Sequence, residues 1–201
     1  TDVSAPEIVS SDYLKPMGLA LSSSGIWVAD EGAGIVYELS ESGEVLRSLD
    51  GFTAPRWIAA SDTHLVVAEA QEGGSVAVLD GDGIRILTVD NAAGEWGPVV
   101  FGGGRFWWSV AEGEDLYSWT AGEEEVSRVA MTAPIQALTG SSEGATLAVG
   151  TSKPWSLLSE SGVDLGVVWG DPQDLAWGGD ALWITTRSAR WPYPGWVYRL
   201  S

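Results

Sequence analysis

Residues 16–51 read PMGLALSSSGIWVADEGAGIVYELSESGEVLRSLDG, and this stretch decides the fold. It divides into four short runs rich in β-branched and aromatic residues, and Gly, Ser or Asp separates each run from the next. Runs of about 5 to 7 residues bounded by such turn formers predict four β-strands. One four-stranded sheet cannot bury both of its faces, so we expect the rest of the chain to supply further copies.

Similar units follow at a spacing of about 40 residues, and a proline marks the first strand of each unit, at positions 16, 55, 98, 134 and 172. Helical repeats of comparable length would need apolar residues at a 3.6-residue spacing, which this chain does not show. The pattern therefore predicts one all-β domain over residues 1–201, a five-bladed β-propeller with four-stranded blades. The predicted blades are residues 16–54, 55–97, 98–133, 134–171 and 172–201, the last together with 7–13.

The last unit ends at Ser201, directly after its third strand, WVYRL. Residues 7–13, EIVSSDY, precede Pro16 as EVLRSLD precedes Pro55, so they resemble a fourth strand without a sheet of its own. We expect residues 7–13 to pair antiparallel with residues 196–200. This pairing would complete the fifth blade and close the ring, which removes exposed sheet edges.

The chain carries 28 acidic and 10 basic residues, which gives a net charge of −18. Such a charge repels phosphates and anionic lipids, so we expect no nucleic-acid partner and no membrane insertion. There is no cysteine, which excludes thiol catalysis and disulfide bonds. The acidic composition, the start at Thr1 without a leader and the Trp-rich repeat predict an exported monomer, secreted, periplasmic or extracellular.

The blade PMGLALSSSGIWVADEGAGIVYELSESGEV resembles the repeats of the NHL, virginiamycin B lyase-like and gluconolactonase-like propeller superfamily. The shared pattern is Pro-x-Gly-[Ile/Leu]-Ala, followed by Gly-x-[Leu/Ile]-[Tyr/Trp]-Val-Ala-[Asp/Glu]. The resemblance implies the architecture alone, since the group ranges from enzymes to interaction scaffolds. Its known members usually have six or seven blades, so the five predicted here are a departure.

Residues for nucleophilic or acid–base catalysis are scarce. The sole histidine, His64, falls in the predicted turn between a first and a second strand, on the face opposite the expected ligand mouth. A Ser-His-Asp triad and the histidine acid implied by the lyase-like resemblance therefore have no candidate. The triple glycine at positions 102–104 lies in a predicted strand-to-strand hairpin, which makes it a turn and not a phosphate loop.

Carboxylates offer a second possibility, because oxygen ligands at a channel mouth can hold calcium or another divalent cation. The candidates are Asp30 and Glu69, which end two second strands, and Asp174 near the start of the fifth unit. They would suit a metal-dependent lactonase or hydrolase of the gluconolactonase type that the resemblance implies. The alternative is that these acids are solvated or cap turns, and the primary prediction is a protein without a cofactor.

The chain contains 12 Trp, and Trp27, Trp107 and Trp183 recur at one blade position, which predicts packing between blades. Other aromatic and basic residues fall in connections expected to emerge on one face, chiefly residues 90–97 and 186–195. We predict that this face binds a ligand through Arg56, Trp57, Trp96, Arg187, Arg190, Trp191 and Tyr193.

Three functions follow from these patterns. The first is a non-catalytic module that binds a protein, a peptide or a glycan. The second is the metal-dependent lactonase or hydrolase, and the third is a structural domain of a larger exported protein.

Overall fold

The computed structural model describes residues 13–90, 94–150, 155–168, 171–178, 181–187 and 196–200. All regular elements in these residues are β-strands, and they form five antiparallel sheets. Among the described residues, no helix is long and apolar enough to cross a membrane.

Four sheets have four strands each and one has three. The first sheet contains β1 (Pro16–Leu21), β2 (Ile26–Asp30), β3 (Ile35–Leu39) and β4 (Val45–Leu49). The second contains β5 (Pro55–Ala60), β6 (His64–Glu69), β7 (Ser75–Asp80) and β8 (Arg85–Asp90). The third contains β9 (Trp96–Gly102), β10 (Arg105–Val110), β11 (Asp115–Trp119) and β12 (Ser127–Ala130). The fourth contains β13 (Ile135–Gly140), β14 (Ala145–Val149), β15 (Trp155–Ser159) and β16 (Asp164–Val168), and the fifth contains β17 (Asp171–Gly178), β18 (Ala181–Arg187) and β19 (Trp196–Leu200).

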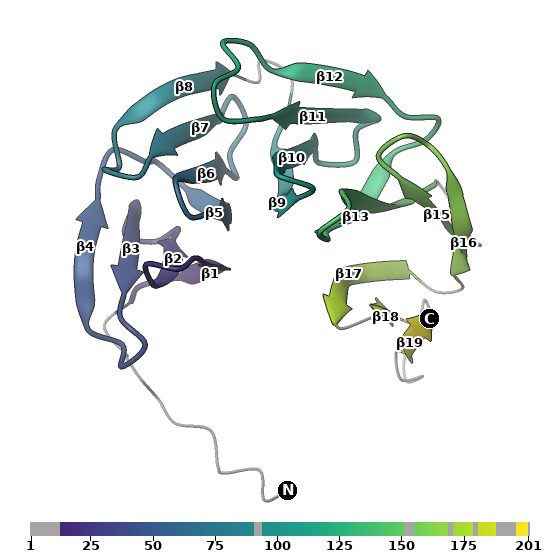
Figure 1. Ribbon diagram of the computed structural model, residues 1–201, viewed down its shortest axis with the longest axis horizontal. Coiled ribbons are helices and arrows are strands. Elements are labelled where there is room, and N and C mark those ends of the chain that lie inside the picture. Colours follow the sequence, from purple (N-terminus) through teal and green to yellow (C-terminus); the bar gives the residue numbers. More distant parts are fainter. Residues whose placement is uncertain are drawn as a thin grey trace, which may run out of the picture.

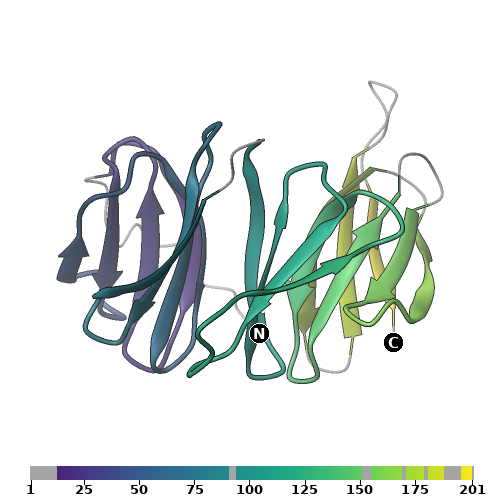
Figure 2. The ribbon, with the colours of Figure 1, turned by 90° about the horizontal axis from the view of Figure 1, so that it is seen from above.

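The five sheets stand side by side in an arc, with the first strand of each sheet on the inner side and the last strand at the rim (Figure 1). Consecutive inner strands pack against each other from β1 through β5, β9 and β13 to β17. Viewed from above, the sheets are arranged in chain order as upright layers (Figure 2). This order places the five inner strands around a common centre.

The core lies between neighbouring sheets, because each of the three middle sheets buries one face against the sheet before it and the other face against the sheet after it. Between the first and second sheets, Trp27, Ala29 and Val36 pack with Ile58 and Val67. Three similar clusters fill the following junctions. At about 25 cal/mol for each Å² of apolar surface buried, this packing is the main stabilising contribution that the fold offers.

The two end sheets each keep one face without a neighbour among the described residues, and the arc is open between β1 and β17 (Figure 1). On β1, Leu19 and Leu21 are 67% and 69% exposed. On the fifth sheet, Trp183 is 42% exposed, whereas Trp27 and Trp107 at the same register position are 5% and 9% exposed. The recurring tryptophans therefore pack between sheets, as predicted, wherever a following sheet exists.

The strand register corrects one detail of the predicted repeat. Pro16, Pro55 and Pro172 occupy the same position in their sheets, paired with Asp30, Glu69 and Thr186 respectively. In the third and fourth sheets this position holds Trp96 and Ile135, so Pro98 and Pro134 are not its equivalents. An inner strand is a sheet edge and can accept a proline at more than one position, which is why the prolines alone misplace the register.

The triple glycine lies in the hairpin between β9 and β10, as predicted. Gly103 and Gly104 have φ angles of 60° and 74°, a conformation that favours glycine. The amide of Gly103 donates to the carbonyl oxygen of Ser141 at 2.8 Å, and a Cβ on Gly102 would lie 2.4 Å from the carbonyl oxygen of Gly144. The glycines thus let one hairpin approach the hairpin of the next sheet closely.

Of the predicted pairing between residues 7–13 and residues 196–200, the first segment lies outside the described residues except for its last residue. That residue, Tyr13, is not part of a strand and packs edge-on against Tyr37 of the first sheet, with 5.3 Å between ring centroids. Within the described residues, β19 is paired only with β18.

We expect Trp27→Ala to lower the free energy of unfolding by about 3 to 5 kcal/mol, because it empties the junction between the first and second sheets. Ile86 on β8 is a matched control, since it is large and apolar but 48% exposed. Ile86→Ala should cost about 0.5 kcal/mol or less. Urea denaturation of both variants measures the difference, and equal losses would contradict this account of the core.

Candidate binding site

Every inner strand carries an irregularity at the same register position. The pairing with the second strand skips Met17 in β1, Arg56 in β5, Gln136 in β13 and Gln173 in β17. In β9 the shift falls at Gly97 and Pro98. A β-bulge of this kind bends the strand and redirects a side chain, and such bulges are common beside functional sites. The repeat therefore places five bulges around the centre of the arc.

Four of these bulges border a cavity of about 430 Å³, which we call the mouth pocket. Its walls come from β5, β9, β13 and β17 and from the connections that hold Glu95 and Glu112. Those connections run from a fourth to a first strand and from a second to a third strand, so the pocket opens on the predicted ligand face. The polar and aromatic side chains in its lining are Arg56, Trp57, Glu95, Trp96, Glu112, Gln136, Gln173 and Asp174.

Arg56 is held at the edge of this pocket by Glu31. The Nε atom of Arg56 donates to Oε2 of Glu31 at 2.8 Å, and Lys15 binds the other carboxylate oxygen. The hydrogen bonds from Arg56 and from Lys15 lower the pKa of Glu31 to about 2. The hydrogen bond to Glu31 likewise raises the pKa of Arg56. The guanidinium is thus a fixed positive charge in the pocket lining.

The described lining combines this one cation with three carboxylates, those of Glu95, Glu112 and Asp174. The side-chain amides of Gln136 and Gln173 add groups that both donate and accept hydrogen bonds. In a chain of net charge −18, this composition disfavours an anionic ligand. It suits a neutral or cationic ligand that bears hydroxyl or amide groups.

Two of the predicted aromatic ligand residues, Trp57 and Trp96, differ in how far they are buried. Trp57 is partly buried and lines the pocket. Trp96 does not lie in the long connection, as expected, but begins β9 and is only 2% exposed. Its Nε1 atom donates to the carbonyl oxygen of Gly74 at 3.0 Å, and its ring packs edge-on against Tyr117. Because the indole is already bonded within the protein, Trp96 supports the pocket wall and is not an exposed anchor.

The remaining predicted ligand residues are not placed at this site. Arg187 ends β18, but its side chain lies outside the described part of the structure. Arg190, Trp191 and Tyr193 also lie outside the described residues. In contrast, Gln136 and Gln173 line the pocket and were missed, because a bulge has no distinctive sequence pattern.

The three candidate metal ligands, Asp30, Glu69 and Asp174, have different roles in the structure. Asp30 is buried and accepts hydrogen bonds from the backbone amides of Leu14, Lys15, Gly32 and Ala33. Burial alone would raise the pKa of Asp30, but these amides hold it below its ordinary value.

Glu69 likewise organises its own connection, since it accepts from the amide of Thr53 at 2.6 Å and from the amide and hydroxyl of Ser75. Asp174 is exposed, lines the mouth pocket and accepts from the amide of Leu175. Within the described ranges, no group of three or more His, Cys, Asp or Glu residues is arranged to hold a metal ion. Asp30 and Glu69 therefore act as caps of turns.

His64 begins β6 at the end of the sheet that is remote from the mouth pocket. Its ring packs edge-on against Trp119 at 5.2 Å, and its Nδ1 atom is 2.8 Å from the hydroxyl of Thr63. The only histidine of the chain thus does not contribute to the pocket.

The fold is that of β-propeller proteins. The chain is similar to a streptogramin B lyase, with a TM-score of 0.66 at 17% identity over 84% of this chain and 61% of that chain. It is also similar to a catalytically inactive virginiamycin B lyase from Staphylococcus aureus with quinupristin, with a TM-score of 0.69 at 14% identity over 95% of this chain and 68% of that chain. The WD40 domain of Neurospora crassa Pan2 gives a TM-score of 0.67 at 10% identity, over 92% of this chain and 60% of that chain.

These similarities confirm the predicted architectural resemblance to propellers of the virginiamycin B lyase kind. The chain spans about 61% of the streptogramin B lyase that it matches. No family model matches the sequence, and no curated protein matches it. At these low identities the likeness concerns the fold alone.

We expect Arg56→Gln to raise the pKa of Glu31 by about one unit or more, because the variant removes the strongest hydrogen bond to that carboxylate. Since the pKa of Glu31 in the folded protein lies below its ordinary value of 4.5, the stabilising effect of this carboxylate is present above pH 4.5. This effect is lost as the pH falls towards 2. As the pH falls from 4.5 towards 2, the free energy of unfolding should therefore decrease less for Arg56→Gln than for the parent protein.

Carboxyl-carbon NMR titration of Glu31 measures the shift directly. Arg128→Gln is the control, because Arg128 pairs with Asp115 in a different sheet. An unchanged Glu31 titration in Arg56→Gln would show that Lys15 alone determines that pKa.

Proposed function

We propose that this chain is a non-catalytic binding module that recognises a peptide segment or a sugar unit in the mouth pocket. The observation that carries the proposal is the convergence of bulge residues from successive inner strands on one cavity of about 430 Å³. Pockets for small ligands usually occupy about 300 to 1,000 Å³ and combine apolar walls with a few fixed polar groups. Trp57 supplies an aromatic wall here, and Arg56, Gln136 and Gln173 supply the polar groups.

The balance of charges supports a ligand with hydroxyl or amide groups over an anion. The side-chain amide of Gln136 can pair with a peptide group or with a sugar hydroxyl, and the Trp57 ring offers a surface for stacking. The connections that carry residues 186–195 were expected on the same face, so Trp191 and Tyr193 remain proposed anchors for a larger ligand.

A metal-dependent lactonase or hydrolase is the weaker proposal. Of the three acids predicted as ligands, Asp174 lines the mouth pocket, whereas Asp30 and Glu69 are bonded to backbone amides. Calcium titration with a parallel assay of lactone hydrolysis tests this alternative. Tight calcium binding that Asp174→Asn abolishes would favour it over the binding module.

The binding proposal is tested by screening the chain against a glycan array and a library of short peptides, followed by calorimetry with the best ligand. We expect Gln136→Ala and Arg56→Ala each to weaken binding about tenfold, because each removes a polar contact with the proposed ligand. Arg128→Ala is a matched control on the rim and should leave the affinity unchanged. Equal affinity in all three variants would place the ligand elsewhere.

We also propose that the domain is a closed ring of five blades and that residues 7–12 add the fourth strand to the fifth sheet. Two facts support this proposal. The other four sheets have four strands, and the end faces expose Leu19, Leu21 and Trp183, which a closed ring would cover. An exported, monomeric protein remains the prediction from the composition.

Deletion of residues 1–12 tests the closure. We expect the truncated chain to melt at a lower temperature or to self-associate, because a sheet edge and two apolar faces would lack a partner. Calorimetry and light scattering on both chains measure these effects. Identical melting and an unchanged monomer mass would contradict the proposed closure.

A further inference from the structure

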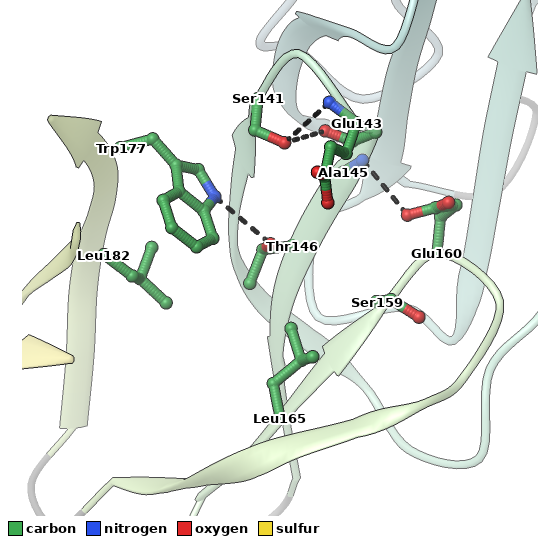
Figure 3. Close-up of a pocket in the computed structure, with 10 residues that line it drawn as sticks. Ser141, Glu143, Ala145, Thr146, Ser159, Glu160, Leu165, Trp177 and Leu182 are labelled. Carbon is green, nitrogen blue, oxygen red and sulfur yellow. Dashed lines mark hydrogen bonds between the residues drawn. The ribbon is translucent and has the colours of Figure 1, made fainter. Parts of the chain in front are cut away.

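A second cavity, of about 380 Å³, lies between the fourth and fifth sheets, and we call it the junction pocket (Figure 3). It is formed by the hairpin between β13 and β14, the end of β15, β16 and the facing strands β17 and β18. Trp177 stands across from Thr146, and its Nε1 atom donates to the Thr146 hydroxyl at 3.3 Å (Figure 3). The Trp177 side chain is large and is still 39% exposed.

At this cavity the fourth sheet has small side chains where the first sheet has two large ones. A row here means the residues that lie side by side on neighbouring strands. In the first sheet, Trp27 on β2 is paired with Glu38 on β3, and this row is the second from the hairpin between β1 and β2. In the fourth sheet, the same row consists of Thr146 paired with Ser159. Both of these small residues line the junction pocket.

The first sheet shows one way in which this row is filled. The guanidinium of Arg47 lies 5.0 Å from the centre of the Trp27 ring and forms an ion pair with Glu38 at 2.8 Å. The third sheet repeats this chemistry with other residues. There the guanidinium of Arg105 lies 5.8 Å from the centre of the Trp107 ring and pairs with Glu123 at 2.6 Å.

The junction pocket contains an aromatic ring and carboxylates but no basic side chain among its described lining residues. Trp177 offers the ring, and Leu165 and Leu182 offer apolar walls (Figure 3). Glu143 and Glu160 supply the carboxylates, and one oxygen of Glu160 accepts a hydrogen bond from the amide of Ala145. An arginine side chain would satisfy both the ring and the carboxylates.

We infer that the junction pocket binds a guanidinium group, as presented by an arginine residue of a peptide. The guanidinium stacks on Trp177 and forms hydrogen bonds with Glu160, and its methylene chain lies against Leu182. The strongly negative chain attracts such a cation over a longer range. This site is separate from the mouth pocket and does not depend on the function proposed there.

The inference is tested with N-acetyl-arginine methylamide, followed by the indole N–H signal of Trp177 in two-dimensional NMR. The citrulline analogue is the matched neutral probe, because it has nearly the same shape without the charge. We expect saturable binding of the arginine probe and about tenfold weaker binding of the citrulline probe. Glu160→Gln should weaken arginine binding about tenfold, and Glu44→Gln on the first sheet should have no effect.

A second variant fills the junction pocket with a tryptophan, as Trp27 fills the space between the first and second sheets. The double variant Thr146→Trp with Trp177→Ala recreates the combination of Trp27 with Ala60 at the equivalent positions. The hydroxyl of Ser141 can then accept a hydrogen bond from the new indole, as the hydroxyl of Ser22 accepts one from Trp27. We expect this variant to fold, judged by its melting temperature, and to lose arginine binding, followed by calorimetry. Equal binding of both probes, no saturable binding, or undiminished binding in the filled variant would each overturn the inference.

Discussion

The structure depends on one interaction, the packing of each sheet face against the opposite face of the next sheet. The strands of one sheet are short, and the hydrogen bonds between them do not cover the apolar side chains on the two faces of the sheet. Trp27, Ala29 and Val36 become buried only because Ile58 and Val67 of the following sheet cover them. The junction between two sheets is therefore the unit of stability, and the repeat of about 40 residues exists to repeat that junction.

This arrangement also explains how polar side chains come to surround one cavity. Stacked sheets fix the position of every inner strand, and a bulge at the same register position in each strand redirects one residue. Three of the residues at these positions, Arg56, Gln136 and Gln173, line the mouth pocket. The junctions can vary too, since Thr146 and Ser159 replace a tryptophan and a glutamate without loss of the strand pairing. The mouth pocket thus lies at a feature that the repeat shares, whereas the junction pocket lies where the fourth sheet differs from the first.

The sequence predicted the strands and the repeat, because alternating apolar residues and turn formers report directly on sheets. It did not predict Gln136 and Gln173, since the bulges appear only in the pairing register. Trp96 was placed in a loop because Pro98 was taken as the repeat marker, whereas the register puts Trp96 at the equivalent position. Asp30 and Glu69 were candidates for metal binding, and only the backbone amides around them reveal their capping role.

The central claim, that contacts between sheets hold the fold together, is tested most directly by a double-mutant cycle across one junction. The cycle combines Trp27→Ala in the first sheet with Ile58→Ala in the second and measures the free energy of unfolding in urea. The account predicts a coupling energy of about 1 kcal/mol or more for this pair. A parallel cycle of Trp27→Ala with Leu138→Ala, which lies in a different cluster, should be additive within about 0.5 kcal/mol. Additivity in the first cycle would contradict the account, because the two sheets would then be stable without each other.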